Sequence, residues 1–111
     1  MNVLLVEDER TIRQGLRDLL ENVIGGVSVS WEAQNGKEAL HILKKEVPDL
    51  LITDVRMPEM NGLDLINQAK SLHSFLSIVV ISGYDEFEYA KKAMRYGVKH
   101  YLLKPVNRSE L

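Results

Sequence analysis

Short apolar runs alternate along the chain with longer segments that carry their apolar residues at helical spacing. Three of these runs are continuous and rich in Val, Ile and Leu, namely residues 2–6, 49–53 and 77–81. Such runs are typical of strands that are covered on both faces, as in a parallel sheet. Residues 27–33 instead alternate Val27, Val29 and Trp31 with polar residues, which suits an edge strand with one face exposed. Residues 100–103 form the fifth predicted strand.

Four segments between and after these runs have the periodicity of amphipathic helices. Their apolar positions are Ile12, Leu16, Leu19, Leu20 and Val23 in the first, Ala39, Leu43 and Val47 in the second, Leu65, Ile66, Ala69 and Leu72 in the third, and Phe87, Ala90, Ala93, Met94 and Gly97 in the fourth. Strands that alternate with helices are connected by right-handed crossovers, which place helices on both faces of a mostly parallel sheet.

This alternation predicts a single α/β domain over residues 1–111. We expect a doubly wound, flavodoxin-like sheet of five parallel strands in the order 2-1-3-4-5. Turn residues agree with this division, because Gly25 and Gly26 can end the first helix and Asn35-Gly36 separates the second strand from its helix. Residues 106–111 resemble the start of a fifth helix that is truncated here, so we expect the domain to continue in the natural protein.

Composition narrows the classes of function. The chain has 111 residues, a formal net charge of −2 and no cysteine, which excludes disulfides and thiolate metal sites. It has no basic stripe for nucleic acid and no polybasic segment for a lipid surface. No apolar stretch approaches the length of a membrane span, and a cytoplasmic protein is the simplest expectation.

Charged and hydroxyl groups follow the predicted strands at their carboxyl ends. Glu7 and Asp8 follow the first strand, Asp54 the third, Ser82 the fourth and Lys104 the fifth. Because the carboxyl ends of parallel strands meet at one edge of the sheet, these groups are expected to converge. Carboxylates from two strands repel each other unless a cation lies between them. Mg²⁺ suits this place, since it takes one or two carboxylates and leaves room for phosphate oxygens.

The same residues suit the transfer of a phosphoryl group. The Asp54 carboxylate would be the nucleophile that attacks phosphorus, while the metal and the Lys104 ammonium neutralise charge on the transferring group. The Ser82 hydroxyl can donate a hydrogen bond to a phosphoryl oxygen. The strand ends therefore predict a site that binds Mg²⁺ and carries a phosphoryl group on Asp54.

Over essentially its whole length the chain resembles a receiver domain of a bacterial two-component response regulator. The resemblance rests on motifs that occur in order: Glu7-Asp8, Asp54 with Pro58 four residues on, Asn61-Gly62, Ser82-Gly83, and Tyr101 three residues before Lys104-Pro105. It implies a phosphoacceptor signalling domain rather than an enzyme. The phosphoryl group would come from the phosphohistidine of a sensor histidine kinase, in a reaction that the receiver itself catalyses with bound Mg²⁺.

The resemblance also implies a role for each residue of the site. The metal ligands would be Asp8 and Asp54 directly, Glu7 mostly through water, and the main-chain carbonyl of Arg56. Ser82 and Tyr101 resemble the paired switch residues of the family. On phosphorylation the hydroxyl would move toward the phosphoryl group, and the aromatic ring would turn inward behind it.

Residues 83–106, GYDEFEYAKKAMRYGVKHYLLKPV, resemble receivers that are joined to AraC-type helix-turn-helix domains. This implies that the parent protein regulates transcription and binds DNA through a C-terminal effector domain absent here. Receivers of this kind commonly form a homodimer through the fourth helix, fifth strand and fifth helix. The alternative is a stand-alone receiver that acts as a phosphorelay intermediate or a protein-binding module.

Other interpretations of single residues and of the whole site remain open at this stage. Asp8 could cap the first helix, and Tyr101 could be an ordinary packing residue. A phosphatase of the haloacid dehalogenase type needs a second acid two residues after its nucleophile, where this chain has Arg56. A flavodoxin-like cofactor binder needs a loop rich in Ser, Thr and Gly after the first strand, whereas the acids 7–9 would repel phosphate.

Overall fold

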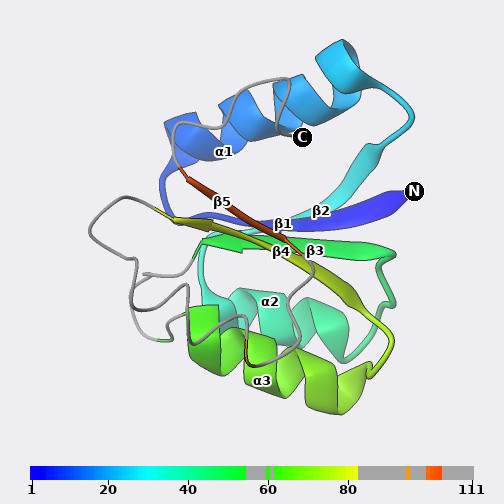
Figure 1. Ribbon diagram of the computed structural model, residues 1–111, viewed down its shortest axis with the longest axis vertical. Coiled ribbons are helices and arrows are strands. Elements are labelled where there is room, and N and C mark those ends of the chain that lie inside the picture. Colours follow the sequence, from blue (N-terminus) through cyan, green and yellow to red (C-terminus); the bar gives the residue numbers. More distant parts are fainter. Residues whose placement is uncertain (55–59, 61, 83–94, 96–99, 104–111) are drawn as a thin grey trace.

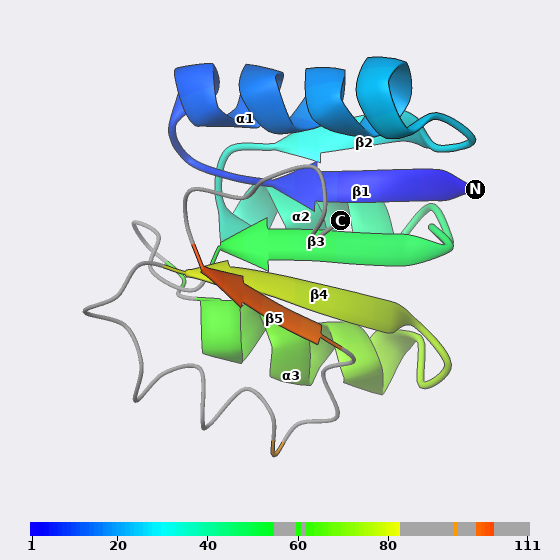
Figure 2. The same cartoon turned by 45° about the horizontal axis from the view of Figure 1, so that its top comes forward.

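A parallel sheet of five strands forms the middle layer of the protein, in the order β2-β1-β3-β4-β5 (Figures 1 and 2). The computed structural model describes residues 1–54, 60, 62–82, 95 and 100–103. The strands are β1 (Asn2–Val6), β2 (Ser28–Ala33), β3 (Leu50–Asp54), β4 (Ser77–Ser82) and β5 (His100–Leu103). The predicted fold class and strand order are confirmed. The predicted fifth helix lies outside the described residues, and so does the predicted fourth helix except for Arg95.

Helices cover both faces of the sheet (Figure 1). One face carries α1 (Arg10–Asp18), which continues into the π-helical turn η1 (Leu19–Ile24). The other face carries α2 (Gly36–Leu43) and α3 (Gly62–Leu72). Of the helices within the described part of the chain, none is both long and apolar enough to cross a membrane.

Each face of the sheet buries a separate apolar core. The core on the α2 and α3 side includes Leu4, Val6, Leu51, Ile78 and Val80 of the strands with Leu43, Leu65, Ile66 and Ala69 of the helices. The core on the α1 side includes Val3, Leu5, Ile52 and Ile81 of the strands with Leu16 and Leu20 of the helix. Successive residues of a strand point to opposite faces, so a strand that is buried on both faces is apolar at most of its positions. This burial explains the continuous runs of Val, Ile and Leu in the sequence.

The edge strand β2 contains an irregularity that strict alternation does not predict. Val3 pairs with Val29 and Leu4 pairs with Trp31, so Ser30 is an extra residue at a register shift between β1 and β2. Val29 belongs to the core on the α1 side, whereas Trp31 packs against the core on the α2 and α3 side. Strict alternation would place Val29 and Trp31 on the same face of the sheet. Because of the extra residue they lie on opposite faces. Glu32, which follows Trp31, is consequently turned toward α1.

Three apolar residues of the predicted helical faces, Val23, Val47 and Leu72, lie at the surface instead. Val23 falls within η1, whose wider turn changes the direction of the side chains, and 43% of its surface is exposed. Val47 is 70% exposed because α2 ends at Leu43. Gly25 and Gly26 end the helical segment as predicted, with φ values of +79° and +74°. Such positive φ values strain any residue with a Cβ atom, so glycine is favoured there.

Candidate functional site

Three acidic residues meet at the carboxyl edge of the sheet. Glu7 directly follows β1 and Asp54 is the last residue of β3, and these two strands are neighbours in the sheet. One carboxylate oxygen from each of Glu7, Asp8 and Asp54 lies within 4.8 Å of the others. Glu7 is 1% exposed and Asp54 is 5% exposed, whereas Asp8 is open to solvent. The structure thus brings together the three acids that the strand ends single out.

Glu7 is held by its main chain and its side chain. Its amide donates a hydrogen bond of 3.0 Å to the carbonyl oxygen of Ala33 at the end of β2. Its own carbonyl oxygen accepts a hydrogen bond of 2.8 Å from Nη1 of Arg13. Its carboxylate oxygen Oε2 accepts one of 3.1 Å from the amide of Glu9. These bonds fix the chain at the point where β1 leads into α1.

Asp54 is positioned by the middle of the sheet. It pairs with Ile81 of β4, and β3 lies between β1 and β4. The preceding residue, Thr53, is completely buried, and its hydroxyl donates a hydrogen bond of 2.9 Å to the carbonyl oxygen of Asp54. The Asp54 carboxylate consequently lies at the carboxyl edge of the sheet, where β1 also ends.

Asp8 does not cap the helix that follows it. The residue at the cap position of α1 is Glu9, and its side chain makes no capping hydrogen bond. The capping interpretation of Asp8 is therefore wrong, because the helix begins one residue too late for it. Asp8 instead presents its carboxylate at the solvent side of the acidic cluster, beside two buried acids.

The donor set of this cluster fits a hard divalent cation. All three side chains offer carboxylate oxygens, the ligand type that Mg²⁺ prefers, and they come from two adjacent strand ends. Two of the acids are almost completely buried, and burial penalises like charges that lie this close unless positive charge is also present. Asp8, the third acid, is exposed to solvent.

The other predicted site residues are described only in part. Ser82 and Tyr101 belong to the neighbouring strands β4 and β5, but their side chains lie outside what the structure describes. Arg56 and Lys104 lie outside the described residues altogether. Their predicted roles remain predictions.

A group of charged residues beside the cluster was not anticipated from the sequence. Nε of Arg13 lies 3.0 Å from Oε1 of Glu32, and Arg17 pairs both with the same Glu32 and, at 3.0 Å, with Glu21. The hydrogen bonds from Arg17 to Glu21 and Glu32 raise the pKa of Arg17. The pKa of Glu21 is lowered mainly by the hydrogen bond from the Val29 amide and, to a smaller extent, by the hydrogen bond from Arg17. The spacing of Arg13 and Arg17, one helical turn apart, could have indicated that the two side chains share a partner. Only the fold shows that this partner is Glu32.

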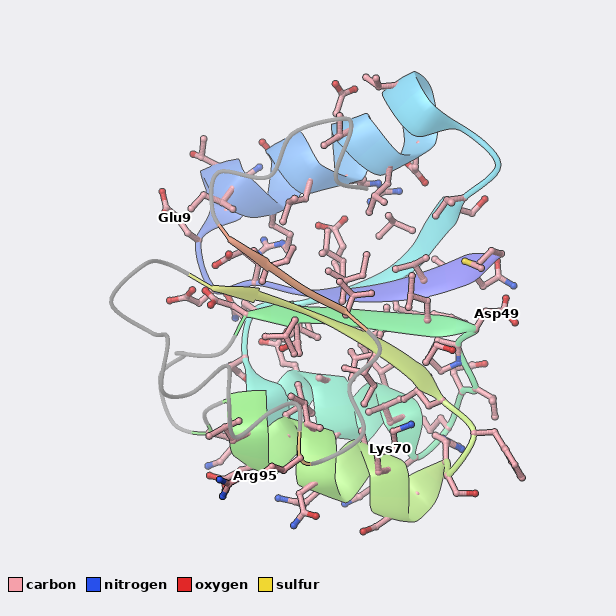
Figure 3. The ribbon with its side chains drawn as sticks, in the orientation of Figure 1. Glu9, Asp49, Lys70 and Arg95 are labelled. Atoms are coloured by element: carbon pink, nitrogen blue, oxygen red, sulfur yellow. The ribbon has the colours of Figure 1, made fainter. Side chains whose placement is uncertain are left out.

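An exposed acid, Asp49, lies at the opposite end of the sheet. Figure 3 shows Glu9 at the end where the acids gather and Asp49 at the far end, where β3 begins. Oδ2 of Asp49 accepts a hydrogen bond of 2.7 Å from the amide of Asn2. Asp49 is thus an exposed acid remote from the cluster, which makes it a useful control position.

The chain belongs to the family of response regulator receiver domains, whose family description matches residues 3–111. A receiver is a phosphoacceptor signalling domain of two-component systems and not an enzyme of the ordinary kind. The fold and the acidic cluster described above agree with this membership.

Curated relatives include regulators of transcription. The chain is 46% identical over 109 residues to the uncharacterized transcriptional regulatory protein YesN of Bacillus subtilis, covering 98% of this chain and 30% of that protein. It is 38% identical over 109 residues to the transcriptional regulatory protein HptR of Staphylococcus aureus, covering 98% of this chain and 42% of that protein. The chain therefore spans less than half the length of these relatives.

Solved structures of receiver domains have the same fold. A response regulator receiver domain protein from Clostridium thermocellum superposes with a TM-score of 0.89 at 32% identity, covering 98% of this chain and 86% of that one. The REC domain of AraT, a response regulator from Geobacillus stearothermophilus, gives a TM-score of 0.88 at 39% identity, covering 98% and 84%.

Proposed function

We propose that this chain accepts a phosphoryl group on Asp54 from the phosphohistidine of a sensor histidine kinase, in a reaction that depends on Mg²⁺. The observation that carries the proposal is the convergence of Glu7, Asp8 and Asp54, with two of the three buried at the end of adjacent strands. Membership of the receiver family supplies the partner class, because receivers take their phosphoryl group from histidine kinases.

The metal would be held by oxygen atoms of the acidic cluster. Asp8 and Asp54 would bind it directly, Glu7 through water, and the main-chain carbonyl of Arg56 would complete the protein ligands. When bound, Mg²⁺ supplies positive charge that offsets the negative charge of the carboxylates and of the phosphoryl oxygens.

The transfer itself is carried out by groups of the chain. A carboxylate oxygen of Asp54 forms a bond to phosphorus while the bond between phosphorus and the kinase imidazole breaks, and the imidazole nitrogen leaves with the electron pair. Lys104 would neutralise charge on the phosphoryl oxygens, and Ser82 would donate a hydrogen bond to one of them. Hydrolysis of the acyl phosphate by water returns the free Asp54 carboxylate.

Phosphorylation would be converted into an output through the switch pair Ser82 and Tyr101. The modification can shift the domain only by stabilising one of two conformations more than the other. We further propose that residues 1–111 form the receiver part of a longer, cytoplasmic regulator of transcription. Support comes from the names and lengths of YesN and HptR, of which this chain spans 30% and 42%.

In such a protein, DNA would be bound by a C-terminal effector domain, of the AraC type by resemblance, and not by this domain. A homodimer through the fourth helix, β5 and the fifth helix would couple the two. The names of these relatives favour transcriptional output over a stand-alone receiver.

The test is the intact mass of the protein after incubation with acetyl phosphate, with and without Mg²⁺. Wild type should gain one phosphoryl group only when Mg²⁺ is present, and Asp54→Asn should gain none. Asp49→Asn is the matched control, since it removes the same charge from the far end of the sheet and should still be modified. An adduct on Asp54→Asn, or none on folded wild type, contradicts the proposal.

A further inference from the structure

Arg13 contacts both the acidic loop and the edge strand. Its Nη1 donates a hydrogen bond of 2.8 Å to the carbonyl oxygen of Glu7, and its Nε lies 3.0 Å from Oε1 of Glu32. The side chains are partly buried, with Arg13 17% exposed and Glu32 27% exposed. One planar guanidinium therefore bridges a main-chain oxygen of the acidic cluster and a carboxylate of β2.

The fold explains why this bridge can form. Arg13 lies one turn into α1, where its amide donates a hydrogen bond of 2.9 Å to the carbonyl oxygen of Glu9. Glu32 faces α1 because the extra residue Ser30 reverses the alternation of β2. Without that irregularity Glu32 would point to the opposite face, and Arg13 would have no anchor on β2.

The bridge acts on a residue whose carboxylate belongs to the cluster. The Glu7 amide is fixed by Ala33 of β2, and the Glu7 carbonyl is fixed by Arg13. With both ends of this peptide segment held, the Glu7 carboxylate can keep its bond from the Glu9 amide and its place beside Asp54. Loss of the Arg13 bond would free the segment that carries Glu7 and Asp8.

We propose that Arg13 is a positioning residue for the metal site, which holds the Glu7 carbonyl so that the carboxylates of Glu7 and Asp8 are preorganised for Mg²⁺. This inference rests on the proposed function. Arg13 touches neither a reacting atom nor a metal ligand oxygen in the described structure; it acts through the main chain of Glu7. Residues that orient metal ligands in this way commonly change metal affinity by about 10- to 100-fold when they are replaced.

Arg17 provides a matched control on the same helix. It pairs with the same Glu32 and with Glu21, whose Oε2 in turn accepts a hydrogen bond of 2.9 Å from the Val29 amide. Within the described part of the chain, the side chain of Arg17 donates hydrogen bonds to these two glutamates and not to Glu7. Replacing Arg17 therefore disturbs the ion pair with Glu32 on β2 and leaves the hydrogen bond from Arg13 to the Glu7 carbonyl in place.

Charge and position have opposite effects on metal affinity, and this allows them to be separated. A guanidinium near the cluster repels a cation, so loss of its charge alone would tighten Mg²⁺ binding. Loss of its hydrogen bond to Glu7 would weaken binding. Arg13→Lys keeps the charge but replaces the two-pronged planar donor by a single ammonium, which cannot reproduce both contacts in the same geometry.

The experiment measures the Kd for Mg²⁺ by isothermal titration calorimetry on the full chain carrying Arg13→Lys or Arg17→Lys. We expect about a tenfold rise in Kd for Arg13→Lys, at the lower end of the range for such residues, and a change of less than twofold for Arg17→Lys. An unchanged Kd for Arg13→Lys overturns the inference. If Arg13→Gln binds Mg²⁺ more tightly than wild type while Arg13→Lys is unchanged, the effect of Arg13 on metal binding is purely electrostatic.

A second readout does not depend on the metal. Hydrogen exchange of the Glu9 amide, which bonds to the Glu7 carboxylate, should be several-fold faster in metal-free Arg13→Lys than in wild type or Arg17→Lys. If wild type fails to bind Mg²⁺, the proposed function fails, and this exchange rate alone decides whether Arg13 positions Glu7. Equal exchange in the two lysine variants would overturn the inference. Should Arg13→Lys not fold, Glu32→Ala takes its place, because it removes the oxygen that anchors Arg13 on β2; an unchanged Kd and an unchanged exchange rate in that variant would overturn the inference.

Discussion

Replacement of Asp54 by Asn is expected to stabilise the metal-free protein. The carboxylates of Glu7, Asp8 and Asp54 lie within 4.8 Å of one another, and two of them are almost completely buried. Asn has nearly the same size as Asp and keeps one acceptor oxygen, so the substitution removes mainly the charge. The folded protein then contains fewer close repulsions, whereas in the unfolded chain the same charges are separated by water.

The magnitude follows from the geometry. At the full separation of 4.8 Å, two unit charges repel by about 3.5 kcal/mol at an effective dielectric constant of 20 and about 0.9 kcal/mol at 80. The buried pair Glu7 and Asp54 corresponds to the first value and the pair with exposed Asp8 to the second. Favourable interactions of the Asp54 carboxylate, which Asn keeps only in part, offset some of this gain. We expect the free energy of unfolding to rise by about 1–3 kcal/mol.

The assay is urea unfolding of both proteins in EDTA and again with Mg²⁺. At a Mg²⁺ concentration ten times Kd, binding should stabilise wild type by about 1.4 kcal/mol, and Asp54→Asn should gain much less. Glu46→Gln, which removes one exposed charge after α2, is the control and should match wild type in both solutions. If Asp54→Asn is less stable than wild type in EDTA while Glu46→Gln is unchanged, repulsion within the cluster is refuted.

Three further substitutions test stability away from the site. A Cβ atom on buried Gly36 would lie 2.9 Å from three atoms of Met60, including its Cβ, so Gly36→Ala should lower the free energy of unfolding by about 1–2 kcal/mol. A Cβ atom on Gly15 would have nothing within 4 Å, so Gly15→Ala should raise the free energy of unfolding by about 0.5–1 kcal/mol in the same urea titration. The pKa of Glu21 is lowered in the folded protein, first by the Val29 amide and then by Arg17, so the stability that this carboxylate contributes is present above its ordinary pKa of 4.5 and is lost as the pH falls below it. The difference in the free energy of unfolding between wild type and Glu21→Gln should therefore be largest at neutral pH and decrease in acid. A difference that stays constant down to low pH would contradict the assignment.

Much of the fold could be predicted from the sequence because burial on two faces leaves a direct signature. The strands β1, β3 and β4 each contain a continuous run of Val, Ile or Leu, and their predicted bounds differ from the observed ones by at most one residue at either end. The acids at the ends of β1 and β3 could be placed together for the same reason, since parallel strands bring their carboxyl ends to one edge.

The helices differ more from their sequence-based predictions than the strands do. Apolar spacing assigned Val23 and Val47 to buried faces, but the π-helical turn and the early end of α2 leave both exposed. Helical periodicity gives a direction only while the helix keeps one geometry, and its ends depend on hydrogen bonds that the pattern does not record. Asp8 shows the same limit, because a shift of one residue in the start of α1 removed it from the cap position.

The sequence by itself thus determined the layers of this protein and the acidic edge where its chemistry is expected, because periodicity and strand ends are local properties of the chain. The order of the strands was expected only from the doubly wound class to which this alternation belongs. Only the tertiary structure decided that Ser30 interrupts β2, that Glu32 consequently faces α1, and that Arg13 reaches both Glu32 and the Glu7 carbonyl. Those contacts join residues 6 and 19 positions apart. Their geometry depends on the pairing register of two strands, which is settled by the packing of both faces at once and leaves no mark in any single stretch of sequence.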